Sequence, residues 1–145
     1  MIRALIADDH ELVRGIIRSL LDQANTIEVV YEAMDGLGAL EKIGEIKPDI
    51  AILDISMPNM DGIQVAEKIQ ELDLDTQIIM LSMHSDPILV QELLKSGVRG
   101  YLIKDSLVED LIPAIHSAMQ RKIYISPSIN SPDLNDLIGK GNGHS

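Results

Sequence analysis

Three aspartates follow two apolar runs that have the composition of buried strands. Asp8 and Asp9 come directly after residues 2–7, and Asp54 comes directly after residues 50–53. A carboxylate buried without a partner is very unfavourable. Carboxylates that share one pocket also repel one another unless a cation lies between them. If the two strands are neighbours, the pattern predicts a divalent-cation site in which one carboxylate remains free to react.

Two further polar residues hold the same position after apolar runs. Ser82 follows residues 78–81, and Lys104 follows residues 101–103. In open α/β sheets, ligands bind beyond the carboxyl ends of the strands. Oxygen ligands with open water positions suit Mg²⁺, which neutralises a phosphoryl group during in-line attack. A carboxylate can be the nucleophile and form an aspartyl phosphate, whose oxygens a hydroxyl and an ammonium group would bind.

The elements that position these residues alternate between short β-branched runs and apolar residues at helical spacing. Five strands are expected, over residues 2–7, 27–33, 50–53, 77–81 and 100–103. Helical spacing predicts a helix after each strand; Gly36, Gly38 and Gly44 weaken the second one. The alternation predicts an α/β fold, doubly wound, with a five-stranded parallel sheet covered on both faces.

Helix start signals support these boundaries. Asp9 is expected to cap the first helix, and residues 61–64 read as a capping box for the third. Pro87 fits the first turn of the fourth helix. Residues 106–109 read as a capping box for the fifth helix.

Composition limits the class of protein. The 145 residues are 46% hydrophobic, which suits one folded domain. A net charge of −11 disfavours binding of DNA or an anionic membrane through the general surface. The chain has no cysteine, and it shows no signal peptide and no apolar run that could span a bilayer. We therefore expect a cytoplasmic protein with a domain over 1–122 and a flexible linker or tail over 123–145.

Four motifs, taken together and in order, resemble the receiver domain of two-component response regulators. They are DDH at 8–10, LDISMPNMDG at 53–62, LSMH at 81–84 and GYLIK at 100–104. The resemblance covers residues 1–122 and implies the flavodoxin-like receiver fold with strand order 2-1-3-4-5. The motif at 100–104 and the Met-His pair at 83–84 are similar to the subfamily with a C-terminal LuxR-type helix-turn-helix.

The resemblance implies roles for the acidic residues. Asp54 would be the phosphoacceptor, taking a phosphoryl group from a histidine kinase. Asp9 would be the principal acidic ligand of Mg²⁺, and Asp8 would act directly or through water. Asp54 and the backbone carbonyl of Ser56 would complete the protein ligands.

The resemblance also implies how the signal leaves the site. Lys104 would contact the phosphoryl group, Ser82 would move to hydrogen-bond it, and Tyr101 would follow inward as an aromatic switch. The face of the fourth helix, fifth strand and fifth helix would then change, controlling homodimerisation or a DNA-binding domain that this sequence does not include. The implied outcome is transcription regulation, with DNA bound only through that domain.

One departure concerns the loop after the lysine. Many receivers have a proline there, joined by a cis peptide bond. This chain has Asp105, and a cis bond without proline is unfavourable by about 3 kcal/mol. The isomer of the Lys104–Asp105 bond therefore stays open.

Two other functions compete with the signalling switch. A Mg²⁺-dependent phosphohydrolase with an aspartyl nucleophile usually needs a second acid two residues later, where this chain has Ser56. A flavin-binding domain of the same fold would need aromatic residues to stack on the flavin, and such residues are scarce. His10, His84 and His116 share no metal-ligand spacing, so we predict that they are non-catalytic.

Overall fold

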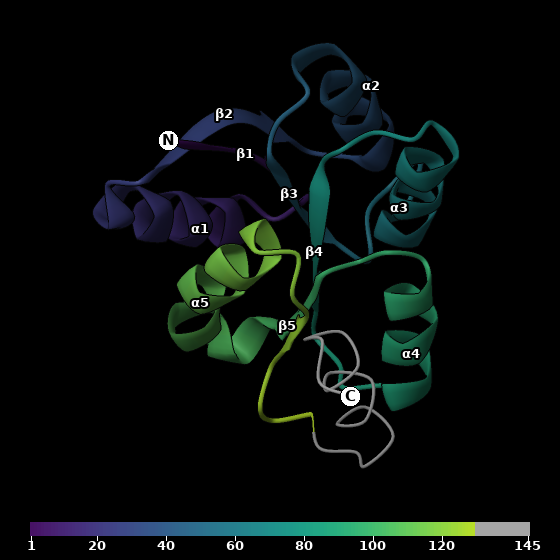
Figure 1. Cartoon of the computed structure of the whole chain (residues 1–145). Coiled ribbons are helices and arrows are strands. Elements are labelled where there is room, and N and C mark those ends of the chain that lie inside the picture. The colour runs from purple at the N-terminus through teal and green to yellow at the C-terminus, as the bar shows by residue number, and fades with distance from the viewer. Residues whose placement is uncertain (130–145) are drawn as a thin grey trace.

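A single parallel sheet forms the centre of the computed structural model, which describes residues 1–129 (Figure 1). Its strands are arranged in the order β2-β1-β3-β4-β5-β6. They are β1 (Ile2–Ala7), β2 (Ile27–Ala33), β3 (Ile50–Asp54), β4 (Gln77–Ser82), β5 (Gly100–Ile103) and β6 (Tyr124–Ile125). The first strand therefore lies between the second and third, and this reversal of the strand order creates the switch point where ligands bind in such sheets.

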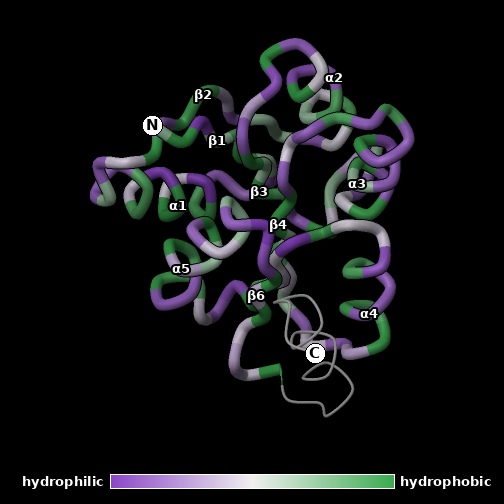
Figure 2. Tube along the Cα trace, viewed as in Figure 1, coloured by the Kyte–Doolittle hydropathy of each residue, from purple (hydrophilic) through white to green (hydrophobic). Residues whose placement is uncertain are grey.

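Among the described residues, five helices cover the two faces of the sheet. They are α1 (Glu11–Ala24), α2 (Gly36–Ile46), α3 (Gly62–Glu71), α4 (Pro87–Lys95) and α5 (Leu107–Met119), with a short 3₁₀ turn, η1 (Lys104–Ser106), before the last. Helices α1 and α5 pack on one face, and α2, α3 and α4 on the other (Figure 1). Each helix carries both hydrophobic and hydrophilic residues (Figure 2), as helices with one buried face require.

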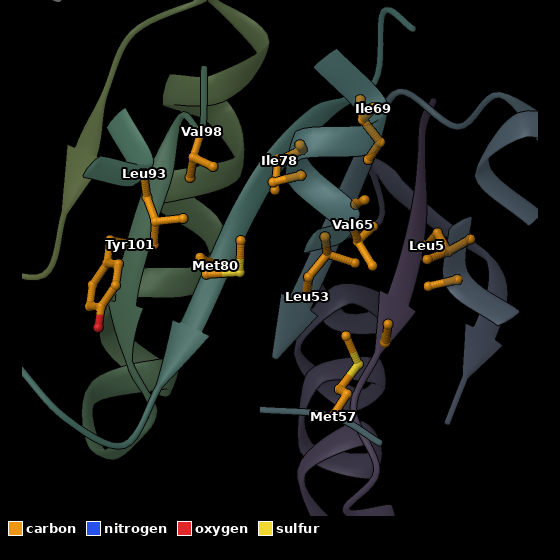
Figure 3. Packing of buried hydrophobic residues seen from close by; sticks show 14 of the residues in the cluster. Leu5, Leu53, Met57, Val65, Ile69, Ile78, Met80, Leu93, Val98 and Tyr101 are labelled. Atoms are coloured by element: carbon orange, nitrogen blue, oxygen red, sulfur yellow. The ribbon is translucent and has the colours of Figure 1, made fainter. Parts of the chain in front are cut away.

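Strands β1, β3, β4 and β5 are built around continuous apolar runs because both of their faces are buried, whereas the edge strand β2 carries Glu28 and Glu32. All five residues of β3 are buried. On the side of α3, Val65 and Ile69 belong to the same buried cluster as Leu53 and Ile78 (Figure 3). No helix among residues 1–129 is long and apolar enough to cross a membrane.

The sheet has six strands, so the prediction of five was wrong. The sixth, β6, has two residues and pairs with β5, Gly100 opposite Tyr124 and Tyr101 opposite Ile125. A two-residue strand shows no periodicity, so the sequence offered no pattern to detect it. Residues 130–145 of the expected linker lie outside the described part of the chain.

Two of the predicted helix starts are confirmed. The amide of Gln64 donates to Asp61 Oδ1 at 2.8 Å, and the Gln64 side chain accepts from the Asp61 amide at 3.0 Å. Helix α4 begins at Pro87, and the Asp86 carboxylate accepts hydrogen bonds from the first turn. These caps supply acceptors for amides that lack a partner within the helix.

The other two predicted caps are wrong. Residue His10, not Asp9, precedes α1, and its side chain makes no capping bond. Ser106 precedes α5 but also makes no capping bond; its hydroxyl instead donates to Asp110 Oδ2 at 2.8 Å. In α5 the serine hydroxyl binds a carboxylate of the same helix, Asp110, and at α1 the Asp9 carboxylate remains available to the site beside it.

Three hydroxyl groups surround the buried carboxylate of Asp110. Tyr124 Oη donates to Asp110 Oδ1 at 2.7 Å, while Ser126 and Ser106 donate to Oδ2 at 2.7 and 2.8 Å. Ser126 Oγ also accepts from the amide of Ile103 at 3.0 Å. Because buried polar groups need partners, this network fixes the chain after α5 against α5 and β5.

The Tyr124 phenol should titrate late. Burial first, and then the hydrogen bond and charge of Asp110, raise the pKa of Tyr124 from its ordinary 10.0 to about 12. Between these values the folded protein binds more protons than the unfolded chain, so stability falls as pH rises through this window. An ultraviolet absorbance titration of tyrosinate should show this late transition.

Two variants test that assignment. Tyr124→Phe should remove the late transition. Asp110→Asn should shift it to lower pH, because the neighbouring negative charge is gone. An unchanged late transition in Asp110→Asn would contradict the assignment.

Candidate functional site

The order of the strands brings the three aspartates to one edge of the sheet. Strands β1 and β3 are paired neighbours, with Ala7 opposite Leu53, so the residues that end them lie side by side. Asp8 is fully buried and Asp54 is 3% exposed. One carboxylate oxygen from each of Asp8, Asp9 and Asp54, and one ring nitrogen of His10, lie within 4.8 Å of one another.

Lys104 reaches the same place from the end of β5. Its Nζ atom lies 3.0 Å from Asp8 Oδ2 and 3.1 Å from Asp54 Oδ2, and its side chain is only 7% exposed. Within the described residues neither oxygen has a hydrogen bond of acceptable geometry. Charge attraction to one ammonium group is therefore what stabilises two buried carboxylates, and the site remains short of positive charge.

The pKa values of Asp54 and Lys104 reflect this shortage of positive charge. Burial, with a further contribution from the charge of Asp8, raises the pKa of the Asp54 carboxyl, although Lys104 opposes the shift. Burial disfavours the charge of Lys104, but the two carboxylates outweigh burial and raise its pKa. Lys104 is thus held as a cation, and a second cation would favour ionisation of Asp54.

The donors fit a hard divalent cation. They are carboxylate oxygens at one edge of the sheet, two of them buried and without a hydrogen bond to any described residue, and oxygen ligands are those that Mg²⁺ prefers. The Ser56 amide donates to Asp54 Oδ1 at 3.3 Å, so the Ser56 backbone, whose carbonyl was predicted as a metal ligand, lies beside the Asp54 carboxylate. The residues present therefore fit Mg²⁺.

Ser82 and Tyr101 both form hydrogen bonds with the backbone of His84, in the loop after β4. Asp54 pairs with Leu81, and Ser82 lies one residue beyond it, 4% exposed. Ser82 Oγ accepts from the His84 amide at 3.1 Å, and Tyr101 Oη donates to the His84 carbonyl at 3.0 Å. Tyr101 is fully buried, and its hydroxyl points away from Leu93 (Figure 3). Burial raises the pKa of this phenol.

Sequence reasoning missed the position of His10. Its Nδ1 lies 2.9 Å from Asp8 Oδ1 and 3.2 Å from Asp9 Oδ1. Spacing between histidines is the wrong signal here, because the partners of His10 are the acids that directly precede it in the chain. Its place next to Asp9 could have indicated this position.

The loop after Lys104 is regular. No peptide bond in residues 1–129 is cis, so the Lys104–Asp105 bond is trans. The chain continues directly into η1 and α5, which connects the lysine to the helix that follows.

Comparisons with known proteins agree with this geometry. The family model described as the response regulator receiver domain matches residues 4–116. The oxygen regulatory protein NreC of Staphylococcus epidermidis is 35% identical over 139 residues, which are 95% of this chain and 64% of the relative. The chain thus spans about two thirds of the length of the curated relatives it matches.

Solved structures give the same result. The receiver domain of the putative response regulator NarL from Mycobacterium tuberculosis is 37% identical, with a TM-score of 0.78 over 82% of this chain and 96% of that one. The isolated REC domain of RcsB from Salmonella enterica, determined with phosphomimetic BeF₃⁻, is 27% identical, with a TM-score of 0.81 over 88% of this chain and 95% of that one. This chain belongs to the family of response regulator receiver domains.

Proposed function

We propose that the chain is a phosphorylation-dependent switch in which Asp54 accepts a phosphoryl group from a histidine kinase. The observation that carries the proposal is the pairing around Asp54. Lys104 Nζ lies 3.1 Å from its Oδ2, and oxygens of the Asp8 and Asp9 carboxylates lie within 4.8 Å of an Asp54 oxygen. This combination can hold a cation and a phosphoryl group together at a nucleophilic oxygen.

Each side chain has a distinct task in this proposal. Asp8, Asp9, Asp54 and the Ser56 carbonyl would hold Mg²⁺, which neutralises charge on the phosphoryl group. Asp54 must be ionised to attack, and its raised pKa shows that the bare site resists this charge. Lys104 offsets part of that resistance and remains beside the product, whose phosphoryl group carries a charge of about −1.5 to −2.

The same charge would alter the contacts that lead away from the site. Ser82 Oγ would turn toward the phosphoryl oxygens and lose the hydrogen bond that it now accepts from the His84 amide at 3.1 Å. The His84 carbonyl also accepts a hydrogen bond from the Tyr101 hydroxyl at 3.0 Å, so a movement of His84 would change the environment of the Tyr101 side chain. A two-state switch needs about 5.5 kcal/mol to move from 1:99 to 99:1, and charge-assisted hydrogen bonds can contribute much of it.

The proposed output is control of homodimerisation or of a DNA-binding domain through the face formed by α4, β5 and α5. Similarity to NreC, NarL and RcsB supports transcription regulation in a two-component system. Any contact with DNA would come from outside the receiver domain, and we propose the cytoplasm as the compartment shared with the kinase. Ser56 in place of a second acid makes the phosphohydrolase the weaker alternative, and a signalling protein rather than an enzyme is expected.

Labelling with a small phosphodonor tests the function. Incubation with acetyl phosphate and Mg²⁺ should add one phosphoryl group per chain, seen by intact-protein mass spectrometry, and Asp54→Asn should abolish it. Asp105→Asn is the matched control, because Asp105 is exposed and lies next to Lys104. A chelator should prevent labelling. Labelling that survives in Asp54→Asn, or continuous release of phosphate from phosphomonoesters, would contradict the proposal.

A further inference from the structure

An imidazole lies among the carboxylates of the site. His10 Nδ1 is 2.9 Å from Asp8 Oδ1, 3.2 Å from Asp9 Oδ1 and 3.9 Å from Asp54 Oδ2. In an octahedral shell with metal–ligand distances of about 2.1 Å, adjacent ligand atoms lie about 3.0 Å apart and opposite ones about 4.2 Å apart. The spacing of Nδ1 from the two preceding carboxylates is therefore that of adjacent ligands in one shell.

The backbone fixes where this ring can lie. The His10 amide donates to Asp8 Oδ1 at 2.8 Å, so the residue is tied to the first aspartate by its main chain as well as by its ring. Its side chain makes no cap to α1 and is 61% exposed. Neither helix capping nor burial in the core accounts for the orientation of the ring, whose polar contacts within residues 1–129 are all with carboxylates of the cluster.

The geometry points to His10 as a nitrogen ligand that makes this site prefer borderline transition metals, such as Mn²⁺ and Co²⁺, over Mg²⁺. The inference rests on the proposed cation site at Asp54. Carboxylate oxygens alone suit Mg²⁺, whereas imidazole suits later transition metals, and affinity rises from Mn²⁺ to Co²⁺ in a mixed nitrogen and oxygen site. Nδ1 binds the metal in its unprotonated form, with Asp8 and Asp9 as neighbouring ligands.

Metal titrations of four proteins test the inference. Isothermal titration calorimetry with Mg²⁺, Mn²⁺ and Co²⁺ should be run on the unmodified chain, His10→Ala, His10→Gln and His116→Ala. Both His10 variants should bind Co²⁺ about tenfold to a hundredfold more weakly. Their affinity for Mn²⁺ should fall less, and their affinity for Mg²⁺ should stay essentially unchanged. His116 lies on α5 near Met1 and Ile2, at the opposite edge of the sheet, so His116→Ala should leave all three affinities unchanged.

A spectroscopic signature separates coordination from a structural effect. Pulsed electron paramagnetic resonance of the Mn²⁺-loaded protein should show hyperfine coupling to a directly bound nitrogen. This coupling should persist in His116→Ala and vanish in both His10 variants. Thermal unfolding of the variants checks that they fold, and the exposure of His10 makes a large loss of stability unexpected.

The outcomes distinguish this inference from the function on which it rests. Asp9→Asn should weaken binding of all three metals. If Asp9→Asn does so, but His10→Ala changes neither the Co²⁺ affinity nor the nitrogen coupling, the role of His10 is overturned and the cation site remains. If the unmodified chain binds none of the three metals, the cation site and the role of His10 both fail.

Discussion

Replacing Lys104 with methionine is expected to lower the free energy of unfolding at neutral pH by about 3 kcal/mol. The substitution leaves Asp8 and Asp54, which are 0% and 3% exposed, without the ammonium group that lies 3.0 and 3.1 Å from them. Breaking a buried ion pair by removing one partner leaves an uncompensated charge. The lower end of the usual range applies, because the raised pKa of Asp54 lets it take up a proton instead.

The pH dependence has a definite sign. The folded protein binds more protons than the unfolded chain between the ordinary pKa of Asp54, 3.8, and its raised value, so stability falls as pH rises through that window. Losing Lys104 removes an influence that lowers this pKa and extends the window upward. The stabilisation from Lys104, whose own pKa is raised, is present below its ordinary 10.5 and lost as pH rises through the folded value.

Denaturant unfolding across a double-mutant cycle measures the effect. Lys104→Met, Asp54→Asn and the double variant should show that the loss from Lys104→Met is smaller once Asp54 is neutral. Mg²⁺ should restore part of the stability of Lys104→Met, because binding to the folded state stabilises it. Lys122, exposed in the turn after α5, is the control, and Lys122→Met should change stability by less than about 0.5 kcal/mol.

The opposite result has a clear meaning. If Lys104→Met is as stable as the unmodified chain, desolvation of the three charges outweighs their attraction. That balance is known for buried ion pairs replaced by apolar residues. The lysine would then be retained for its contact with the phosphoryl group and not for the stability of the resting domain.

The sheet and the acidic edge were predictable because both depend on strong local patterns. A strand buried on both faces is apolar along its length, so a polar residue at its last position or directly after it marks its carboxyl end, as Asp54, Asp8 and Lys104 do. Parallel pairing then brings those ends together whatever the loops do. The local pattern therefore determines which residues share the edge.

Features that depend on tertiary partners were not predictable in this way. Ser106 fits the pattern of a helix cap, but it makes no capping bond, and its hydroxyl instead donates to Asp110, which Tyr124 and Ser126 also bind from beyond α5. Strand β6 forms because β5 offers an open edge, a property of the sheet and not of Tyr124 or Ile125. His10 was misjudged for a different reason: its two nearest partners, Asp8 and Asp9, directly precede it in the chain, and only Asp54, 3.9 Å away, depends on β1 ending beside β3.

Replacing Gly36 with alanine is expected to destabilise the fold by about 3 kcal/mol. A Cβ atom at this position would overlap the backbone carbonyl of Met60, in the loop between Asp54 and α3. Backbone is harder to displace than the end of a flexible side chain. Asp35 ties the same two segments together, since it accepts from the Gly38 amide at 2.7 Å and from Asn59 Nδ2 at 2.9 Å.

The same helix contains a control of opposite sign. Nothing lies within 4 Å of a Cβ atom placed on Gly44, so Gly44→Ala should stabilise the protein by about 0.5–1 kcal/mol through helix propensity alone. Chemical denaturation of both variants measures the difference, and acetyl phosphate labelling of Asp54 should slow only in Gly36→Ala, because Met60 belongs to the loop that follows Asp54. Equal stabilisation by both substitutions would show that this loop yields freely to α2. Stability changes of opposite sign would show that glycine is kept at position 36 despite its low helix propensity, because the loop beside the phosphoacceptor requires that space.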